Sequence, residues 1–202
     1  SFAKLYCDAY QNDYGWVTTG ASNLEELNLL LKEVSIRRKK EDVLDLPPKV
    51  RSWVPVDVAS SPSAVESSLA FIRWYAATDP ASPNEFLAKL MKVRTALHKA
   101  KHKAVEERIR DVLATGQKVV VFTSFTEGLK RHAKTLGGSC VTISGSDTAE
   151  QRQVAVERFQ DDPEVRVAVC NLIAGGVGIT LTAGTHVIFQ DLDWVPANHA
   201  QA

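Results

Sequence analysis

The chain has 202 residues, and its 24 Lys or Arg residues balance 24 Asp or Glu residues, so its formal net charge is zero at pH 7. This length is sufficient for a buried core without disulfide or metal support. Cys7, Cys140 and Cys170 are too few and too widely spaced for a disulfide scaffold or a typical structural zinc site. The apolar runs are too short to span a bilayer, and residues 1–10 lack the apolar core of a secretory signal. We therefore expect an intracellular protein with no membrane partner. Because the net charge is zero, any nucleic acid would have to bind at local basic patches.

The first 60 residues contain one amphipathic run among mixed aromatic and polar residues. Apolar side chains at positions 24, 27, 30, 31 and 34 recur at intervals of three and four, which predicts a helix that begins after Ser22 or Asn23. A charged cluster at residues 37–42 follows. Pro47 and Pro48 then favour an extended exit from this region.

Residues 61–116 read as helices that are broken by Asp79-Pro80 and Ser82-Pro83. The last helical stretch is rich in basic side chains, namely Lys89, Lys92, Arg94, Lys99, Lys101, Lys103, Arg108 and Arg110. A phosphate-contacting surface and an ordinary solvated helix face explain this pattern equally well. His98 and His102 have the spacing of helical metal ligands, but the lysines around them would repel a cation, so we expect no metal site.

From Gln117 onward, short β-branched runs alternate with helical patterns. The predicted strands comprise residues 119–122, 140–143, 165–169 and 186–189. One helix is predicted over residues 126–136, and a second begins after Asp147 or Thr148 and ends at Asp162-Pro163. This alternation predicts an α/β fold in which helices flank a parallel sheet.

Small polar residues and glycines follow the first three predicted strands. They are Ser124 after the first strand, Ser144 and Gly145 after the second, and the stretch 171–180 after the third. Ligands of open α/β sheets bind beyond the carboxyl ends of the strands, and exposed backbone amides suit phosphate oxygens. We therefore predict a phosphate-binding rim, although each segment taken singly also fits an ordinary turn.

Two common nucleotide-binding motifs are absent from the sequence. Gly176 and Gly178 follow a strand, but the third glycine of a dinucleotide fingerprint would fall on Leu181, and no acidic residue lies about twenty positions further on. No G-x-x-x-x-G-K-[ST] segment occurs in the 202 residues. The main cradle for a triphosphate is therefore missing from this chain.

An ordered series of segments resembles the motifs of Swi/Snf-type superfamily-two DNA translocases. Residues 119–125 look like motif four, residues 143–159 look like the following motif, and residues 174–181 look like motif five. Residues 187–202 are similar to the approach to motif six, and residues 37–49 to the basic segment after the first motor lobe. The similarity is closest to the annealing-helicase branch of this family.

The resemblance implies a RecA-like C-terminal helicase lobe that is preceded by a mainly helical connector. On this reading, residues 1–60 form the connector after the first motor lobe, residues 61–100 a helical linker or protrusion, and residues 101–202 the lobe. The arginine finger of motif six would lie beyond Ala202, so we interpret the chain as a fragment that carries no catalytic residue by itself.

The resemblance also implies which residues meet DNA and nucleotide. The implied DNA contacts are Ser124, Gly145, Arg152, Asn171, Leu172, Ala174 and Gly175. The implied nucleotide contacts are Gly176, Gly178 and Thr180. The implied cofactor is ATP with Mg²⁺, and the implied partners are double-stranded DNA and the missing N-terminal RecA-like lobe. Asn171 and Leu172 depart from the family's usual Ser-Thr pair, and Val195 stands in place of an Asn.

The intact protein is thus expected to be an ATP-dependent DNA translocase, nuclear in a eukaryote or associated with the nucleoid in a bacterium. Two other classes stay open from the residues alone. One is a non-catalytic module that binds DNA or protein through its basic helices. The other is a small-molecule α/β enzyme that uses the glycine-rich loop.

Overall fold

The computed structural model describes residues 1–36, 49–77, 82–175, 179–195 and 199. The side chains of residues 174 and 175 are outside this description. The chain divides into two compact units, Ser1–Trp53 and Val54–Ala202. Among the described residues, no helix is long and apolar enough to cross a membrane.

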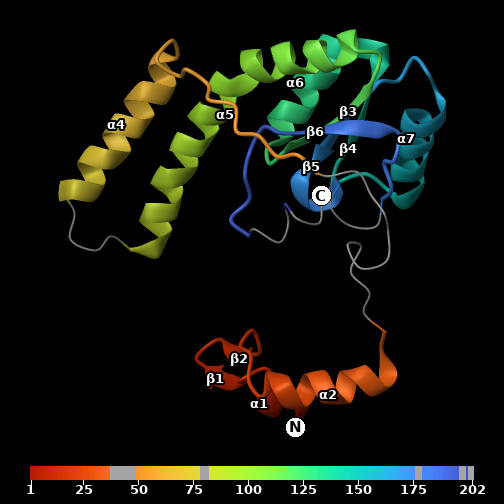
Figure 1. The fold of residues 1–202 in the computed structure, drawn as a ribbon. Coiled ribbons are helices and arrows are strands. Elements are labelled where there is room, and N and C mark those ends of the chain that lie inside the picture. The colour runs from red at the N-terminus through yellow and green to blue at the C-terminus, as the bar shows by residue number, and fades with distance from the viewer. Residues whose placement is uncertain (37–48, 78–81, 176–178, 196–198, 200–202) are drawn as a thin grey trace. The chain divides into compact units, whose positions relative to one another are not determined.

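Where the structure describes the first unit, at residues 1–36 and 49–53, it shows two helices and a small hairpin (Figure 1). Helix α1 (Phe2–Tyr6) is followed by the antiparallel strands β1 (Tyr10–Asn12) and β2 (Gly15–Val17) and by α2 (Leu24–Val34). The bounds of α2 confirm the predicted amphipathic helix. Asn23 occupies the N-cap position but makes no side-chain cap bond, and its side-chain nitrogen donates to the carbonyl oxygen of Leu5 at 2.8 Å.

The second unit is built on a parallel sheet with the strand order β4-β5-β3-β6 among the described residues. The strands are β3 (Lys118–Thr123), β4 (Cys140–Ile143), β5 (Val167–Asn171) and β6 (Gly184–Phe189). Thr123 pairs with Asn171, and Ile143 with Cys170, so the carboxyl ends of β3, β4 and β5 reach the same edge. The predicted parallel α/β fold is confirmed.

The third strand begins two residues later than its sequence suggested. Val165 precedes β5 and is fully buried, whereas the backbone amide of Arg166 donates to Ser139 at 2.9 Å. A β-branched residue therefore fills the core before the strand ladder begins. Side-chain preference alone does not show where the backbone pairing starts.

Helices cover both faces of the sheet, with α5 (Pro83–Ala114) and α6 (Thr126–Leu136) on one face and α7 (Ala149–Asp161) on the other. Alternate residues of β3 and β5 point to opposite faces, so residues 119–122 and 167–170 are all apolar. The face under α5 and α6 packs Val105, Ile109, Val119, Val121, Leu129 and Val167. The face under α7 packs Val120, Phe122, Phe159, Ala168, Cys170 and Leu172.

Local signals set the helix starts. Thr148 and Gln151 form a reciprocal capping box at the start of α7, with bonds of 2.9 and 3.2 Å. The hydroxyl of Ser82 accepts the amide of Glu85 at the start of α5, where Pro83 occupies the first helical turn. The short segments η1 (Gly137–Ser139) and α8 (Leu172–Gly175) also belong to this unit.

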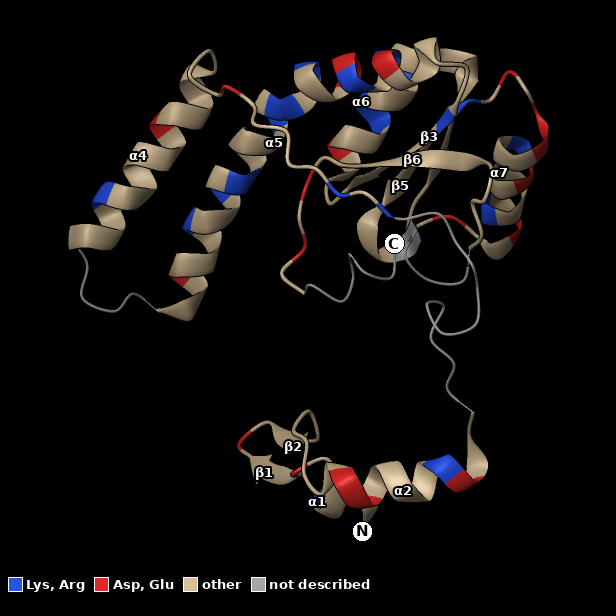
Figure 2. Cartoon of the chain, in the orientation of Figure 1, with Lys and Arg blue, Asp and Glu red and all other residues tan. Residues whose placement is uncertain are grey.

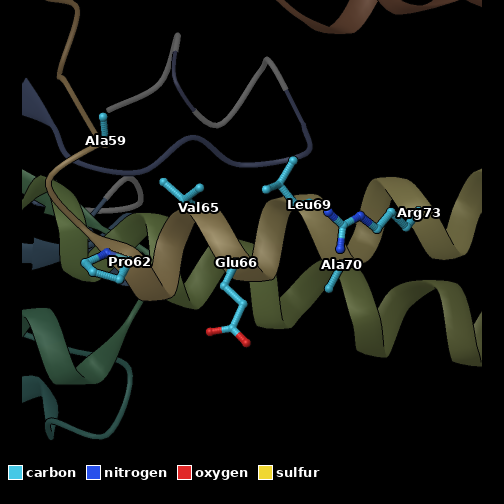
Figure 3. A pocket seen from close by; sticks show the side chains of 7 residues that line it. All are labelled: Ala59, Pro62, Val65, Glu66, Leu69, Ala70 and Arg73. Carbon is cyan, nitrogen blue, oxygen red and sulfur yellow. The ribbon is translucent and has the colours of Figure 1, made fainter.

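Helix α4 (Pro62–Ala77) packs beside the first half of α5 and forms a helical hairpin with it (Figure 1). The contact is an aromatic cluster in which the ring of Phe71 lies 5.7 Å from that of Phe86, and the Lys89 ammonium lies 4.8 Å from the Trp74 ring. A largely apolar groove that includes Glu66 and Arg73 runs along α4 (Figure 3). The boundary that the sequence suggested at residue 100 falls inside α5, which is continuous from the hairpin to the sheet.

Replacement of Phe159 by Ala tests the packing under α7. Phe159 is fully buried, so we expect the free energy of unfolding to fall by about 3–5 kcal/mol. The matched control is Val154→Ala, because Val154 lies on the same helix and is 54% exposed, and its effect should stay within about 0.5 kcal/mol. Urea unfolding followed by circular dichroism measures both, and equal effects would contradict this account of the core.

Candidate nucleic-acid interface

Some of the polar residues predicted to contact phosphate are among the described residues, and these lie at the carboxyl edge of the sheet. Ser124 directly follows β3, Gly145 lies two residues after β4, and Asn171 ends β5. The aligned strand register brings the three loops to one edge. Arg152 joins them from α7, because its Nη2 donates to the carbonyl oxygen of Gly145 at 3.4 Å.

The loop after β4 is ordered by Asp147. Its carboxylate accepts the backbone amide of Ser144 at 2.6 Å and the hydroxyl of Ser144 at 2.9 Å. A Cβ atom built on Gly145 would have no heavy atom within 4 Å. The backbone at Gly145 is therefore open to an approaching ligand, beside the guanidinium of Arg152.

The other DNA candidates differ in how their side chains lie. The Oγ of Ser124 and the Nε of Arg152 are enclosed and have no hydrogen-bond partner among the described residues. The Oδ1 of Asn171 accepts the amide of Ile173 at 3.3 Å. Leu172 is 1% exposed, so only its backbone could meet a ligand. Ala174 and Gly175 belong to α8.

Thr180 is the one described member of the predicted nucleotide set, because Gly176 and Gly178 lie outside the described residues. Thr180 is exposed, and its neighbours Ile179 and Leu181 pack on the core under α7. The segment then leads to the start of β6. The described part of the chain shows no hydrogen bond that joins Thr180 to the strand-end loops.

A buried carboxylate, which the sequence did not identify as part of the site, lies behind the loop after β3. Asp191 follows β6, and its Oδ2 accepts the hydroxyl of Thr123 at 2.9 Å and the amide of Ser124 at 3.3 Å. The Nδ1 of His98 lies 2.8 Å from Oδ2, and the ammonium of Lys101 lies 3.0 Å from Oδ1. Asp191 therefore joins the end of β6, the β3–α6 turn and α5.

The proton positions in this network follow from its acceptors. A carboxylate only accepts, so Nδ1 of His98 carries the hydrogen toward Asp191. The amide nitrogen of Gln190 lies 3.2 Å from the carbonyl oxygen of His98 and 3.0 Å from Nδ1 of His102, which must therefore accept. The remaining amide oxygen of Gln190 accepts Nε2 of His132 at 2.7 Å. The network thus holds the histidines in fixed tautomers.

Burial and charge shift the acidities of these groups. Burial alone raises the pKa of Asp191, but the hydrogen bond from His98 and the charge of Lys101 outweigh it and hold the pKa well below its usual range. Burial and the nearby charge of His98 lower the pKa of His102 to about 4. Burial also lowers the pKa of His132. At neutral pH the centre of the network is the ionised carboxylate of Asp191, which lies beside the ammonium of Lys101.

His98 and His102 therefore serve the core, although their spacing also fits metal ligation. Among the described residues, no group of three or more His, Cys, Asp or Glu side chains is placed to hold a metal ion. One pattern in the sequence does indicate that these two histidines are buried. Both histidines lie on the stripe of α5 that continues into Val105 and Ile109, which is the stripe that packs on the sheet.

Basic residues of α5 mostly pair within the protein, and Figure 2 shows acidic and basic positions interleaved along this part of the chain. Lys99 pairs with Glu127 at 3.3 Å. Arg94 donates to the carbonyl oxygen of Leu192 at 2.6 Å, and its guanidinium lies 4.4 Å from the Trp194 ring. These pairs favour a structural role for much of the basic face over a continuous phosphate-binding surface.

Gly128 allows α6 to approach the network closely. A Cβ atom at this position would lie 2.8 Å from Cε1 of His98 and 2.8 Å from the hydroxyl oxygen of Thr123. Both neighbours are buried and hydrogen-bonded, so neither can move aside easily. Gly128 weakens α6 locally, but it permits the contact between α5, α6 and β3.

Replacement of His102 by Gln is expected to flatten the dependence of stability on pH. The pKa of His102 is about 4 in the folded protein, against about 6.5 in an unfolded chain. The stabilisation from this low pKa is complete above pH 6.5 and is lost as pH falls toward 4. The wild type should therefore lose on the order of 2 kcal/mol more unfolding free energy than the variant between pH 7 and pH 4.5. Urea titrations at both pH values measure this difference, and parallel losses in the two proteins would contradict it.

The sequence of the chain matches a known protein family and two groups of relatives. Residues 100–202 match the family described as helicase conserved C-terminal domain. The whole chain is 36% identical to a Bos taurus DNA annealing helicase and endonuclease ZRANB3, of which it covers 20%. It is 34% identical to a Xenopus tropicalis SWI/SNF-related matrix-associated actin-dependent regulator of chromatin subfamily A-like protein 1, of which it covers 22%. The chain thus spans about a fifth of the length of these curated relatives.

A solved structure supports the same fold. The Sulfolobus solfataricus SWI2/SNF2 ATPase core in complex with dsDNA matches 84% of this chain and 42% of its own chain, with a TM-score of 0.60 and 22% identity. The likeness confirms the RecA-like arrangement of the sheet and its helices. The family match shows that the chain belongs to the helicase conserved C-terminal domain family.

Proposed function

We propose that the chain is the second motor lobe of an ATP-dependent translocase on double-stranded DNA. In this role it contributes contacts to the DNA backbone and part of the ATP site. The observation that carries the proposal is the common sheet edge at which Ser124, Gly145 and Asn171 follow three aligned strands. Arg152 adds a positive charge beside the open backbone of Gly145.

The proposal fits the chemistry of a phosphate backbone. Hydroxyl, amide and guanidinium groups at strand ends can position a DNA strand without reading its bases. The half-buried guanidinium of Arg152 lies beside the open backbone of Gly145, and a charged donor in this position suits a phosphate oxygen. The solved SWI2/SNF2 core that shares this fold was described with dsDNA, which supports the same partner here.

ATP is the proposed cofactor, but this chain supplies only part of its site. The exposed hydroxyl of Thr180 can meet a nucleotide, whereas no P-loop occurs in the 202 residues. The described residues offer no carboxylate cluster for Mg²⁺. We therefore assign the phosphate cradle and the Mg²⁺ ligands to an N-terminal RecA-like lobe of the intact protein, which is the proposed protein partner.

The proposed mechanism is closure of the two lobes on the nucleotide. ATP hydrolysis supplies the free energy that alternates the closed and open states. In the closed state Thr180 meets the nucleotide while the loops after β3, β4 and β5 grip the DNA backbone. In the open state the loops release the DNA backbone and can bind it again further along the duplex. Such a motor works inside the cell, in a nucleus or a bacterial nucleoid.

A second candidate is a DNA- or protein-binding module without motor activity. The acidic and carbonyl partners of the α5 basic residues argue against a large free basic face. A third candidate is a small-molecule enzyme that uses the glycine-rich loop, of which Gly176 and Gly178 lie outside the described residues. The groove along α4 offers no second site for such an enzyme, because Glu66 and Arg73 are the only charged residues among the described ones that line it. ATP turnover that rises on addition of duplex DNA separates the motor from both alternatives.

Replacement of Arg152 by Ala should weaken DNA binding by the intact protein about three- to tenfold. Loss of one phosphate contact should also lower the slope of log affinity against log salt by about one. Arg158→Ala is the matched control, because Arg158 is an exposed arginine of the same helix that is not placed at the strand-end loops. Fluorescence anisotropy with a labelled duplex at several salt concentrations measures both variants, and equal losses would contradict a specific contact at Arg152.

Replacement of Thr180 by Ala tests the nucleotide side. We expect the KM for ATP in DNA-stimulated hydrolysis to rise about three- to tenfold, because one charge-assisted hydrogen bond is lost. The affinity for DNA without nucleotide should not change. Thr182→Ala provides the control on the same segment, since Thr182 bonds to Gln160 at 2.9 Å instead. An unchanged KM for ATP would remove Thr180 from the proposed site.

A further inference from the structure

The turn between β3 and α6 is fixed by two oxygen atoms. The Oδ2 of Asp191 accepts the Thr123 hydroxyl at 2.9 Å and the Ser124 amide at 3.3 Å. The hydroxyl oxygen of Thr123 in turn accepts the amide of Phe125 at 3.2 Å. Three consecutive residues of the turn therefore take their positions from Asp191 and Thr123.

Asp191 is itself held from α5. His98 donates to Oδ2, and the ammonium of Lys101 contacts both Oδ1 and the carbonyl oxygen of Gln190. One helical turn earlier, Arg94 binds the carbonyl oxygen of Leu192. Residues 190–192 are thus attached to α5 at successive points, and α5 is anchored under the sheet by Val105, Ile109 and Val112.

Charge balance makes this arrangement compatible with a phosphate ligand. An unpaired carboxylate directly behind the turn would repel the DNA backbone. The adjacent Lys101 ammonium offsets that charge at a distance of 3.0 Å. The side chain of Asp191 is 5% exposed, so its role is to hold the turn from inside and not to contact DNA.

We infer that Asp191 and Thr123 are positioning residues for the DNA-phosphate contact at the β3–α6 turn. The inference rests on the proposed function, because it assigns the turn its ligand. Asp191 orients the Ser124 peptide through the bond to its amide, and Thr123 links the carboxylate to the next peptide. Loss of either link lets the turn relax and misplaces Ser124 relative to the DNA strand.

The first test compares Thr123→Val with Thr123→Ser in the intact protein. Valine keeps the shape of Thr123 but removes the hydroxyl, whereas serine keeps the hydroxyl. We expect the Kd for a duplex to rise three- to tenfold in Thr123→Val, with Thr123→Ser close to wild type. The salt slope should stay unchanged in both variants, because the Ser124 contact is uncharged and its loss releases no counterion. Thr142→Val is the matched control, since Thr142 is an exposed residue of β4 in the same sheet. The KM for ATP should stay unchanged in all three, which a general loss of structure would not produce.

The second test follows the turn without any ligand. In Asp191→Asn, hydrogen exchange of the Ser124 amide should accelerate at least tenfold, while the amides of Val120 and Val121 keep their protection. Faster exchange throughout β3 would assign Asp191 to overall stability and overturn the inference.

The possible results separate this inference from the proposed function. If Thr123→Val binds DNA as tightly as Thr123→Ser while Arg152→Ala is weakened, the positioning role is wrong and the motor lobe stands. If the wild-type protein does not bind duplex DNA, the proposed function is wrong. The inference, which rests on that function, is then wrong as well.

Discussion

Parallel pairing of β3 with β5 and β6 is the constraint on which the candidate site depends. The ladder places Phe122 opposite both Cys170 and Phe189, and Thr123 opposite Asn171. Because the strands run in one direction, the segments after them emerge at the same edge, and residues far apart in sequence become neighbours. Burial of alternate residues under helices on both faces keeps this register in place. The chemistry of the edge therefore follows from the packing of the sheet.

Much of this arrangement could be predicted from the sequence, because it depends on local patterns. The apolar run at residues 119–122 predicted a strand of the parallel sheet, and the helix expected after Asp147 or Thr148 is α7. The series of motif-like segments indicated the RecA-like lobe. The start of β5 was misplaced because Val165 satisfies the same apolar preference outside the ladder.

The network around Asp191 could not be predicted in the same way. His98 and Asp191 are 93 positions apart, and their contact depends on the crossing of α5 over the end of β6. Taken along the chain, the spacing of His98 and His102 fits metal ligands, and only the surrounding lysines argued against a metal site. The pairing of their nitrogens with Gln190 and Asp191 required the tertiary structure. Ser124 was identified from its place after a strand, but the carboxylate that supports it was not.

The contact at Gly128 limits how this lobe can vary in evolution. Any side chain at this position would need the space now filled by the imidazole of His98 and the hydroxyl of Thr123. A homologue that carries alanine there must also have a smaller residue in place of His98, or a shifted α6. Glycine at 128 and histidine at 98 should therefore covary, and an alignment of close homologues would show which lobes share this buried support and which hold the same turn by other means.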